Sequence, residues 1–329
     1  MSADLYSKII EPVSTEFTQF RDYYKSLFTN ENAYVNMLLQ HFAQNNGKFM
    51  RPLLVFLLAK LCGYKSDLVL YSLASSFELL HSASLVHDDV VDNSFVRRGN
   101  HSVNALYNNK IAVLLGDYVL SLSLEQLHKT QNISLLREFA LLSEKLSEGE
   151  ILQLNSLKLP TLSESLYYDI INRKTAYLFG VCAKSVAILS DFEPHLADKF
   201  MDLGLLIGNC FQIKDDVMDI VPSEQMNKTS GNDLKEGKFT LPVIYALNNS
   251  NLDWSNAISQ IKSCNASDSV LKQVTDYAIN NGGVEYSYSV MQKLKNQAFE
   301  LLFSINKNAP TDVVEAISAY FDLIIERKY

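Results

Sequence analysis

Residues 77–92 read FELLHSASLVHDDVVD, an apolar stretch that ends in three aspartates. In an α-helix, Asp88 and Asp92 are four residues apart and therefore lie on one face. Like charges at this spacing repel each other by roughly 0.2–0.5 kcal/mol. Carboxylates gathered at the end of an apolar helix therefore predict a bound cation. Oxygen-only ligands suit a hard divalent ion, above all Mg²⁺, which usually bridges protein carboxylates to phosphate.

A second stretch repeats this pattern, because residues 207–219 read IGNCFQIKDDVMD. Either triad alone is equally well explained as a solvated helix end. Two triads with the same spacing favour a shared metal site. The expected metal ligands are the aspartates of both triads: Asp88, Asp89, Asp92, Asp215, Asp216 and Asp219.

The composition favours long helices. The chain of 329 residues contains 12 glycines and 7 prolines, well below the usual frequencies of about 7% and 5%. Helical periodicity runs nearly throughout, and no strand pattern of period two persists. The sequence predicts one all-α domain over residues 1–329, a helical bundle around a central cavity. The expected helices lie near 3–28, 30–44, 49–62, 67–92, 102–128, 132–154, 163–190, 194–220, 241–248, 254–262, 268–282, 285–306 and 311–327.

Charge and cysteine usage restrict the partners and the compartment. The net charge of −8 disfavours nucleic acid and an anionic membrane surface. The four cysteines have neither metal-ligand nor redox spacing, which is typical of reduced core residues in the cytoplasm. The first twenty residues lack the apolar core of a secretion signal. We expect a soluble, cytoplasmic protein without stable membrane insertion.

The first triad helix changes character along one face. Phe77, His81, Ser84, Asp88 and Asp92 share this face within roughly 40°, so it is apolar at one end and acidic at the other. Such a gradient suits an amphiphilic ligand with a charged head and a hydrocarbon tail. A core helix whose polar end reaches solvent would have the same pattern.

Basic residues stand close to glycines at several points of the chain. A basic cluster is usually a solvated face, and a surface ion pair contributes little stability. Arginine also suits phosphate, because its guanidinium can donate two parallel hydrogen bonds. The basic clusters are Lys48 with Arg51, Arg97 with Arg98, Arg173 with Lys174, and the polar loop 227–238 with Lys228, Lys235 and Lys238.

Taken together, these segments resemble the trans-polyprenyl (isoprenyl) diphosphate synthases of the long-chain type. The resemblance covers most of the chain and is carried by motifs in a fixed order. The motifs are Gly47-Lys48, the stretch 78–92, Arg97-Arg98-Gly99, Glu148-Gly149-Glu150, Lys174-Thr175-Ala176, the stretch 211–219, the stretch 231–242, Gly282-Gly283-Val284-Glu285-Tyr286 and Glu326-Arg327-Lys328.

The resemblance implies the isoprenoid synthase fold and a prenyltransferase reaction. Isopentenyl diphosphate is added head to tail to an allylic diphosphate such as farnesyl or geranylgeranyl diphosphate. Pyrophosphate leaves, the double bond attacks the allylic cation, and a proton is lost. Charge separation is the barrier, so magnesium and cationic side chains are needed, and water must be excluded. The family further implies about three Mg²⁺ ions per site and a homodimer.

The resemblance also implies roles for individual residues. The two triads hold magnesium from opposite sides. The residues expected to act on the reacting carbon are Lys174, Thr175 and Gln212. Those expected to bind the allylic diphosphate are Arg97, Lys174, Lys228 and Lys238, and those expected to bind isopentenyl diphosphate are Lys48, Arg51, His81 and Arg98. His87 is assigned to structure.

One segment departs from the family pattern. Asn46 stands where the family has a glycine, and Phe49 stands where it has a basic residue. Because Lys48 and Arg51 remain, we expect activity with weaker affinity for isopentenyl diphosphate.

Product length is expected to depend on the side chains below the first triad. Ala83 and Ser84 are too small to stop a growing tail as an aromatic residue would. Leu80 and Phe77 are larger, and Phe77 lies roughly 16 Å below Asp88 along the helix axis, where it could form a floor. The sequence predicts an all-trans product longer than geranylgeranyl diphosphate, from hexaprenyl to decaprenyl with octaprenyl favoured, for quinone side chains.

Three alternatives remain open. The first is a shorter-chain synthase that makes farnesyl or geranylgeranyl diphosphate. The second is a terpene cyclase or squalene-type synthase, a class that lacks the second diphosphate pocket expected at Lys48, Arg51, His81 and Arg98. The third is a non-catalytic subunit of a heteromeric synthase, a class that typically loses its acidic motifs.

Overall fold

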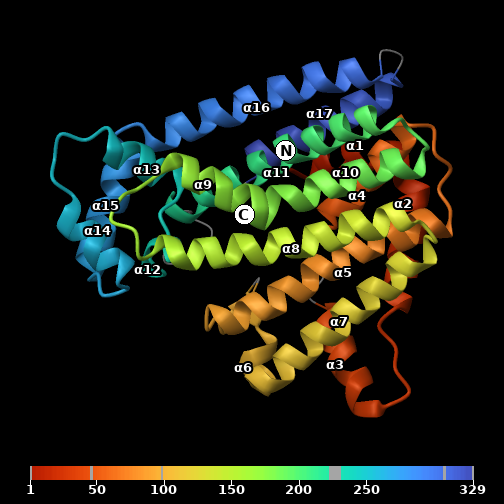
Figure 1. The fold of residues 1–329 in the computed structure, drawn as a ribbon, viewed down its shortest axis with the longest axis horizontal. Coiled ribbons are helices and arrows are strands. Elements are labelled where there is room, and N and C mark those ends of the chain that lie inside the picture. Colours follow the sequence, from red (N-terminus) through yellow and green to blue (C-terminus); the bar gives the residue numbers. More distant parts are fainter. Residues whose placement is uncertain (1, 45–46, 98, 222–230, 307–308, 328–329) are drawn as a thin grey trace.

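The helix that carries the first aspartate triad, α5 (Leu68–Val91), runs through the bundle beside α7 and α8 (Figure 1). It begins where the Asp67 side chain accepts a hydrogen bond from the Leu70 amide at 2.9 Å, a typical N-terminal cap. The computed structural model describes residues 2–44, 47–97, 99–221, 231–306 and 309–327. Within the described chain, α5 has the length and composition to cross a bilayer, but 72% of its apolar window is buried in the bundle. It therefore packs as a core helix.

The described residues form helices almost throughout, as predicted. The first half contains α1 (Ser2–Ile10), a 3₁₀ turn (Glu11–Val13), α2 (Ser14–Ser26), α3 (Ala33–Gln44), α4 (Met50–Leu61), α5, α6 (Val103–Tyr107), α7 (Asn109–Lys129) and α8 (Ile133–Ser156). The second half contains α9 (Glu164–Ile171), a π turn (Asn172–Ala176), α10 (Tyr177–Leu189), α11 (Pro194–Ile220), α12 (Asn232–Lys235), α13 (Leu241–Asn248), α14 (Ser255–Lys262), α15 (Asp268–Asn280), α16 (Gly283–Ile305) and α17 (Thr311–Glu326).

Three expected helices are interrupted. The helix expected at 3–28 breaks at Pro12, which cannot donate the backbone hydrogen bond of a helix interior. The helix expected at 102–128 breaks at Asn108, whose φ of 102° lies outside the helical region. The helix expected at 163–190 contains the π turn. The sequence also did not predict α12 or the two-residue strands β1 (Val96–Arg97) and β2 (Asn100–His101), which pair antiparallel.

Aromatic packing explains the departure at position 49. Phe49 is buried, with its ring centroid 5.2 Å from that of Tyr24 and 6.0 Å from that of Phe20. Its backbone has φ 51°, an uncommon value for a residue other than glycine. Edge-on aromatic pairs of this kind contribute about 0.5–1.5 kcal/mol beyond their buried area. Phe49 therefore anchors the start of α4 to α2.

Helices α12 to α15 gather at one end of the bundle, on the left in Figure 1. They share a second hydrophobic cluster that includes Leu234, Val243 and Trp254. Helix α11 links the two clusters, because Ile213 lies in the first and Ile220 in the second. The second triad therefore lies where the main bundle meets this end, and the C-terminal end of α5 reaches the same region.

Candidate active site

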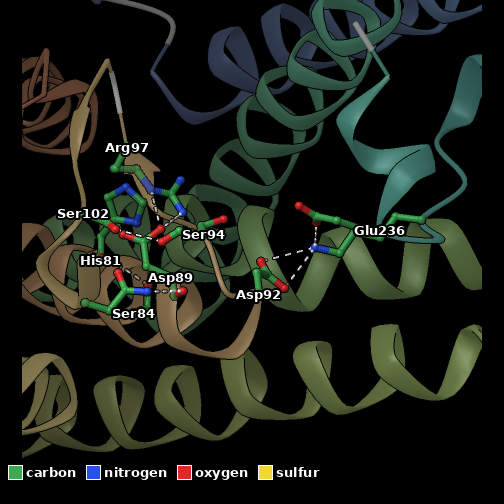
Figure 2. A network of polar contacts seen from close by, with 10 residues as sticks. His81, Ser84, Asp89, Asp92, Ser94, Arg97, Ser102 and Glu236 are labelled. Carbon is green, nitrogen blue, oxygen red and sulfur yellow. Dashed lines mark hydrogen bonds and ion pairs between the residues drawn. The ribbon is translucent and has the colours of Figure 1, made fainter. Parts of the chain in front are cut away.

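The first triad divides its carboxylates between two sides of the end of α5. Asp89 is buried and accepts hydrogen bonds from Arg97, at 2.9 Å from Nε and 2.6 Å from Nη2. Asp92 caps α5 and lies on the other side, 3.3 Å from Lys238 Nζ. Figure 2 shows Arg97 above Asp89 and, at a separate point, Asp92 and Glu236 on either side of the Lys238 ammonium nitrogen. Asp88 and Asp92 therefore lie on one side of the end of α5, and Asp89 lies on the other.

Glu150 on α8 joins the first triad from across the bundle. Its carboxylate pairs with Lys174 Nζ. Burial raises the pKa of Asp88 to about 6. Lys174 opposes this pKa shift, whereas the charges of Glu150 and Asp92 increase it. Three carboxylates thus influence one another at this point. The sequence motif Glu148-Gly149-Glu150 contained this residue, but only its contacts identify it as part of the site.

Lys238 connects the first triad to the end of the bundle that follows the second triad. Its Nζ lies 2.6 Å from Glu236 and 3.3 Å from both carboxylate oxygens of Asp92. Burial alone would lower the pKa of Lys238. The hydrogen bond to Glu236 and the charges of Glu236 and Asp92 outweigh burial, so the pKa of Lys238 is raised. The ammonium group therefore stays charged between Glu236 and Asp92.

In the second triad, Asp216 is the centre of a buried hydrogen-bond network. It accepts from Tyr167 at 2.5 Å and from Gln212 Nε2 at 2.8 Å. Thr175 in turn donates to Gln212 Oε1 at 2.7 Å. Burial raises the pKa of Tyr167 well above its ordinary value, so this phenol remains a donor. The chain of bonds joins two residues predicted to act on the reacting carbon, Thr175 and Gln212, to a predicted metal ligand.

The other two aspartates of the second triad are held by different partners. Asp215 pairs with Arg327 Nη2 at 2.7 Å, close to the C-terminus. Asp219 accepts from the backbone amides of Asn232 and Asp233, each at 3.1 Å, and so fixes the start of α12. Their predicted roles as metal ligands therefore require these contacts to be exchanged or shared.

A cleft with a cavity volume of about 160 Å³ lies between these groups. Its lining includes the predicted site residues Lys174, Thr175, Gln212 and Lys238, together with Asp233. Its remaining lining is partly apolar and comprises Gln153, Ser156, Tyr167, Ile170, Ile171, Asp216, Phe239 and Thr240. Because Lys238 lines the same cleft as Asp216 and contacts Asp92, the two triads face a common space.

The carboxylates near this cleft fit magnesium in their chemistry. Asp88, Asp92 and Glu150 offer carboxylate oxygens, the ligand type that Mg²⁺ prefers. Their crowding, which raises the pKa of Asp88, would be relieved by a cation. Among the described residues, no three His, Cys, Asp or Glu side chains are already arranged as a metal site. Lysines pair with Glu150 and Asp92 instead.

Arg97 is separated from the lysines with which the resemblance grouped it. It lines a smaller cavity of about 60 Å³ together with Asp89, Gly47 and His101, on the other side of α5. It does not line the cleft that contains Lys174 and Lys238. Arg97 therefore lies beside the glycine of the Gly47-Lys48 motif. Its role toward the allylic diphosphate stays a prediction.

The residues expected to bind isopentenyl diphosphate lie in different environments. Lys48 is exposed just before α4, whereas Arg51 is 7% exposed with its guanidinium 4.7 Å from the ring of Phe179. Arg327 stacks on Phe211 at 3.9 Å, and Arg51 lies 5.9 Å from the same ring. His81 is half-buried on α5 (Figure 2).

Two predicted ligands, Arg98 and Lys228, lie outside the described residues. Arg327 belongs to the quoted terminal motif but was missed as a site residue, because its approach to Phe211 joins distant parts of the chain. His87, assigned to structure, lies against α7 with its Nε2 3.2 Å from the carbonyl of Val113.

An aromatic pair crosses the bundle below the acidic end. Phe77 on α5 and Phe139 on α8 are both buried, with their rings stacked at 6.3 Å. Each lies eleven residues before a site carboxylate on its own helix, Asp88 or Glu150, which is about 16 Å at 1.5 Å per residue. Leu80 and Ala83 are buried in α5, whereas the Ser84 hydroxyl bonds back to the His81 carbonyl at 2.8 Å.

Comparison with known proteins gives one family for most of the chain. Residues 32–279 match the family model of polyprenyl synthetase. An all-trans-nonaprenyl-diphosphate synthase (geranyl-diphosphate specific) from Rhodobacter capsulatus is 33% identical over 92% of this chain and 93% of that protein.

Two solved structures have the same fold. A polyprenyl synthase from Caulobacter crescentus CB15, complexed with calcium and isoprenyl diphosphate, has a TM-score of 0.89 at 26% identity and covers 98% of each chain. A geranylgeranyl pyrophosphate synthase from Bacteroides thetaiotaomicron has a TM-score of 0.85 at 35% identity, covering 98% of this chain and 100% of that one. The predicted all-α fold is thereby confirmed.

Proposed function

This chain belongs to the polyprenyl synthetase family, and we propose that it is a magnesium-dependent prenyltransferase making a long all-trans polyprenyl diphosphate. Its substrates are isopentenyl diphosphate and an allylic diphosphate. The observation that carries this proposal is the position of Lys238, which contacts Asp92 of the first triad and lines the cleft with Asp216 of the second. Two acidic walls and two lysines around one cleft suit a diphosphate bound with metal.

The departure of pyrophosphate needs positive charge at its oxygens. When bound, magnesium would neutralise the diphosphate and stabilise the leaving group. Asp88 and Asp92, with Glu150, would hold it at the end of α5. Lys174 and Lys238 would exchange their present carboxylate partners for diphosphate oxygens and donate hydrogen bonds that strengthen as charge develops. We propose about three ions per site, as in the family resemblance.

The allylic cation that remains must be sheltered from water. Ile170, Ile171 and Phe239 supply apolar lining to the cleft. The Thr175 hydroxyl and the Gln212 amide oxygen carry partial negative charge close to Lys174, and their hydrogen bond fixes both. These dipoles would stabilise positive charge on the reacting carbon without providing a strong nucleophile.

For isopentenyl diphosphate we propose Lys48, Arg51 and His81, assisted by Arg327. Arg51 and Arg327 converge on the ring of Phe211, so two guanidinium groups lie close to one end of α11. Lys48→Ala should raise the KM for isopentenyl diphosphate without changing the KM for the allylic substrate. An unchanged KM for isopentenyl diphosphate would remove Lys48 from the site.

We propose that the product is longer than geranylgeranyl diphosphate, and that Phe77 and Phe139 together form the floor that limits it. The small residues Ala83 and Ser84 leave the upper part of the path open. A shorter product is the alternative, because a geranylgeranyl pyrophosphate synthase is 35% identical to this chain. The use of the product for quinone side chains stays a prediction.

Product length can be tested from both directions. Ala83→Phe should shorten the product by placing an aromatic ring near the top of the path, and Phe139→Ala should lengthen it by opening the floor. Leu68→Ala, at an exposed position at the start of α5, is the control. A product distribution indifferent to both changes would mean that the tail follows another path.

We propose a homodimer formed by the outer faces of α7 and α8. Leu114 and Leu124 on α7 are 63% and 45% exposed, and Ile133 and Ile151 on α8 are 77% and 66% exposed. Apolar side chains in such numbers on neighbouring helices are typical of an interface. Leu114→Glu should convert the dimer to a monomer in light scattering, whereas Leu252→Glu, at the opposite end of the fold, should not.

The central experiment is incubation of the purified chain with Mg²⁺, farnesyl diphosphate and labelled isopentenyl diphosphate, followed by chromatography of the dephosphorylated products. Successive elongation products that disappear with EDTA support the proposal. Cyclic hydrocarbon products would instead indicate a terpene cyclase. An absence of turnover that is restored only by a partner protein would indicate a subunit of a heteromeric synthase.

A further inference from the structure

The residues Lys174 and Thr175 stand on a π turn between α9 and α10. The Tyr177 amide bonds to the carbonyl of Asn172, five residues earlier, whereas an α-helix bonds four residues back. A π turn therefore holds one extra residue, and everything after it is rotated by about 100°. The turn decides which side chains of residues 172–176 face the cleft.

Neighbouring helices approach the backbone of this turn at two glycines. A Cβ atom on Gly149 of α8 would lie 2.8 Å from the Lys174 amide nitrogen. A Cβ atom on Gly208 of α11 would lie 2.5 Å from the Cα of Ala176. Distances below 3.0 Å are not tolerated without movement, and here the atoms that would have to move are mostly backbone. The turn is therefore clamped between α8 and α11.

Polar contacts fix the rotation of the turn inside this clamp. Asn209, which is 9% exposed on α11, donates from Nδ2 to the Asn172 side-chain oxygen at 2.8 Å. On the opposite side, Arg173 binds Asp169 at 2.9 Å and pairs with Glu148. The first two residues of the turn, Asn172 and Arg173, are thus held by different partners. Lys174 and Thr175 are left to face Glu150 and Gln212.

We propose that Asn172 and Asn209 are positioning residues, whose hydrogen bond holds the π turn in the register that presents Lys174 and Thr175 to the substrate. This inference rests on the proposed function, because it assigns the pair a role in prenyl transfer. Neither asparagine is among the residues that line the cleft, so the pair acts through the backbone of the turn. Loss of the bond would let the turn relax toward α-helical register and move both side chains.

The test compares Asn172→Leu with Asn172→Asp. Asn172→Leu removes the acceptor, and kcat should fall by about 10²-fold, the effect of roughly 1 Å of misplacement at a reacting group. The KM for isopentenyl diphosphate should stay near the wild-type value, because Lys48 and Arg51 belong to the start of α4 and the residues just before it, not to the turn. Asn172→Asp keeps an acceptor for Asn209 Nδ2 and should restore turnover. Hydrogen exchange at residues 172–177 should speed up in Asn172→Leu but not in Asn172→Asp.

A glycine pair provides a second comparison. Gly208→Ala should reproduce the loss of kcat by pushing on Ala176. Gly180→Ala, on the same α10–α11 contact, meets chiefly the flexible Met201 side chain and should retain activity. Wild-type turnover by Asn172→Leu, or equal losses in Asn172→Leu and Asn172→Asp, would overturn the proposal. If the wild-type chain itself shows no elongation, the proposed function fails, while hydrogen exchange still reports whether the asparagine pair holds the turn.

Discussion

The two aspartate triads share one sequence pattern but have opposite surroundings. Asp88 and Asp92 of the first lie at the end of α5, where their neighbours are lysines with flexible stems, Lys174 and Lys238. The second triad lies within α11, and each of its carboxylates already has partners in the fold. The same spacing therefore lies beside flexible lysines in one place and among fixed contacts of the fold in the other.

This difference suggests that the two triads have different roles. Flexible lysines can release their carboxylates to a metal–diphosphate complex at little conformational cost. The partners of the second triad are a buried tyrosine, an arginine near the C-terminus and backbone amides, and they cannot move so freely. We therefore expect substitutions in the first triad to lower turnover. Substitutions in the second triad should affect the geometry and stability of the fold around α11.

The largest effect is expected in the first triad. Asp88→Asn keeps the shape of the side chain but removes a charge that a metal ion needs. Turnover should fall by about 10³-fold or more, because electrostatic stabilisation of the leaving group is lost. Steady-state assays across a range of Mg²⁺ concentrations would measure it. Folding should be unaffected, and an active Asp88→Asn variant would contradict the contrast between the triads.

Within the second triad, Asp216 is the residue linked by hydrogen bonds to Gln212 and Thr175, the groups expected to act on the reacting carbon. Tyr167→Phe removes one donor to Asp216 and loosens the network that holds Gln212 and Thr175. We expect kcat to fall by about 10-fold to 10²-fold, because misplaced polar groups weaken stabilisation of the cation. Tyr168→Phe is the matched control. Equal kinetics in both variants would separate the network from catalysis.

The ion pair between Asp215 and Arg327 raises the question whether Arg327 takes part in substrate binding. Arg327→Ala leaves Asp215 without its ion pair and removes a guanidinium from the ring of Phe211. The KM for isopentenyl diphosphate should rise by about 10-fold, as for the loss of one charged hydrogen-bond donor. Arg21→Ala, at an exposed position of α2, is the control. A rise in the KM for the allylic substrate instead would place Arg327 in the other subsite.

The smallest effect is expected at Asp219. Asp219→Ala removes the acceptor for the amides of Asn232 and Asp233 and should destabilise the fold by about 1 kcal/mol, the usual cost of losing a helix cap. Thermal unfolding would measure this change. Because α12 precedes Lys238, a modest rise in the KM for the allylic diphosphate should accompany it. A loss as large as that of Asp88→Asn would give both triads the same function.

Much of the site was accessible from the sequence. The periodicity around residues 77–92 predicted a helix with its acids at one end, and the structure has α5 there. The spacing of the two triads predicted the six aspartates, and the fixed order of the family motifs predicted Lys174, Thr175, Gln212 and Lys238. In the structure the last four line one cleft. Their roles stay predictions.

Other parts of the site could not be predicted in this way. Glu150, Tyr167 and Phe139 look like ordinary helix residues, and Arg97 appeared to belong with the lysines until the structure placed it beside Asp89. The contact between Lys238 and Asp92 spans 146 residues of sequence. Nothing in local spacing can indicate such a pairing.

The sequence by itself determined the helices, the acidic ends of two of them and the family. These properties depend on interactions over three or four residues or on motifs read in order. Only the tertiary structure decided which carboxylates pair with flexible lysines and which are held by fixed partners. It also decided where a π turn displaces the register of α10. Those outcomes arise from packing and desolvation between distant segments, and the energies involved exist only once the bundle has formed.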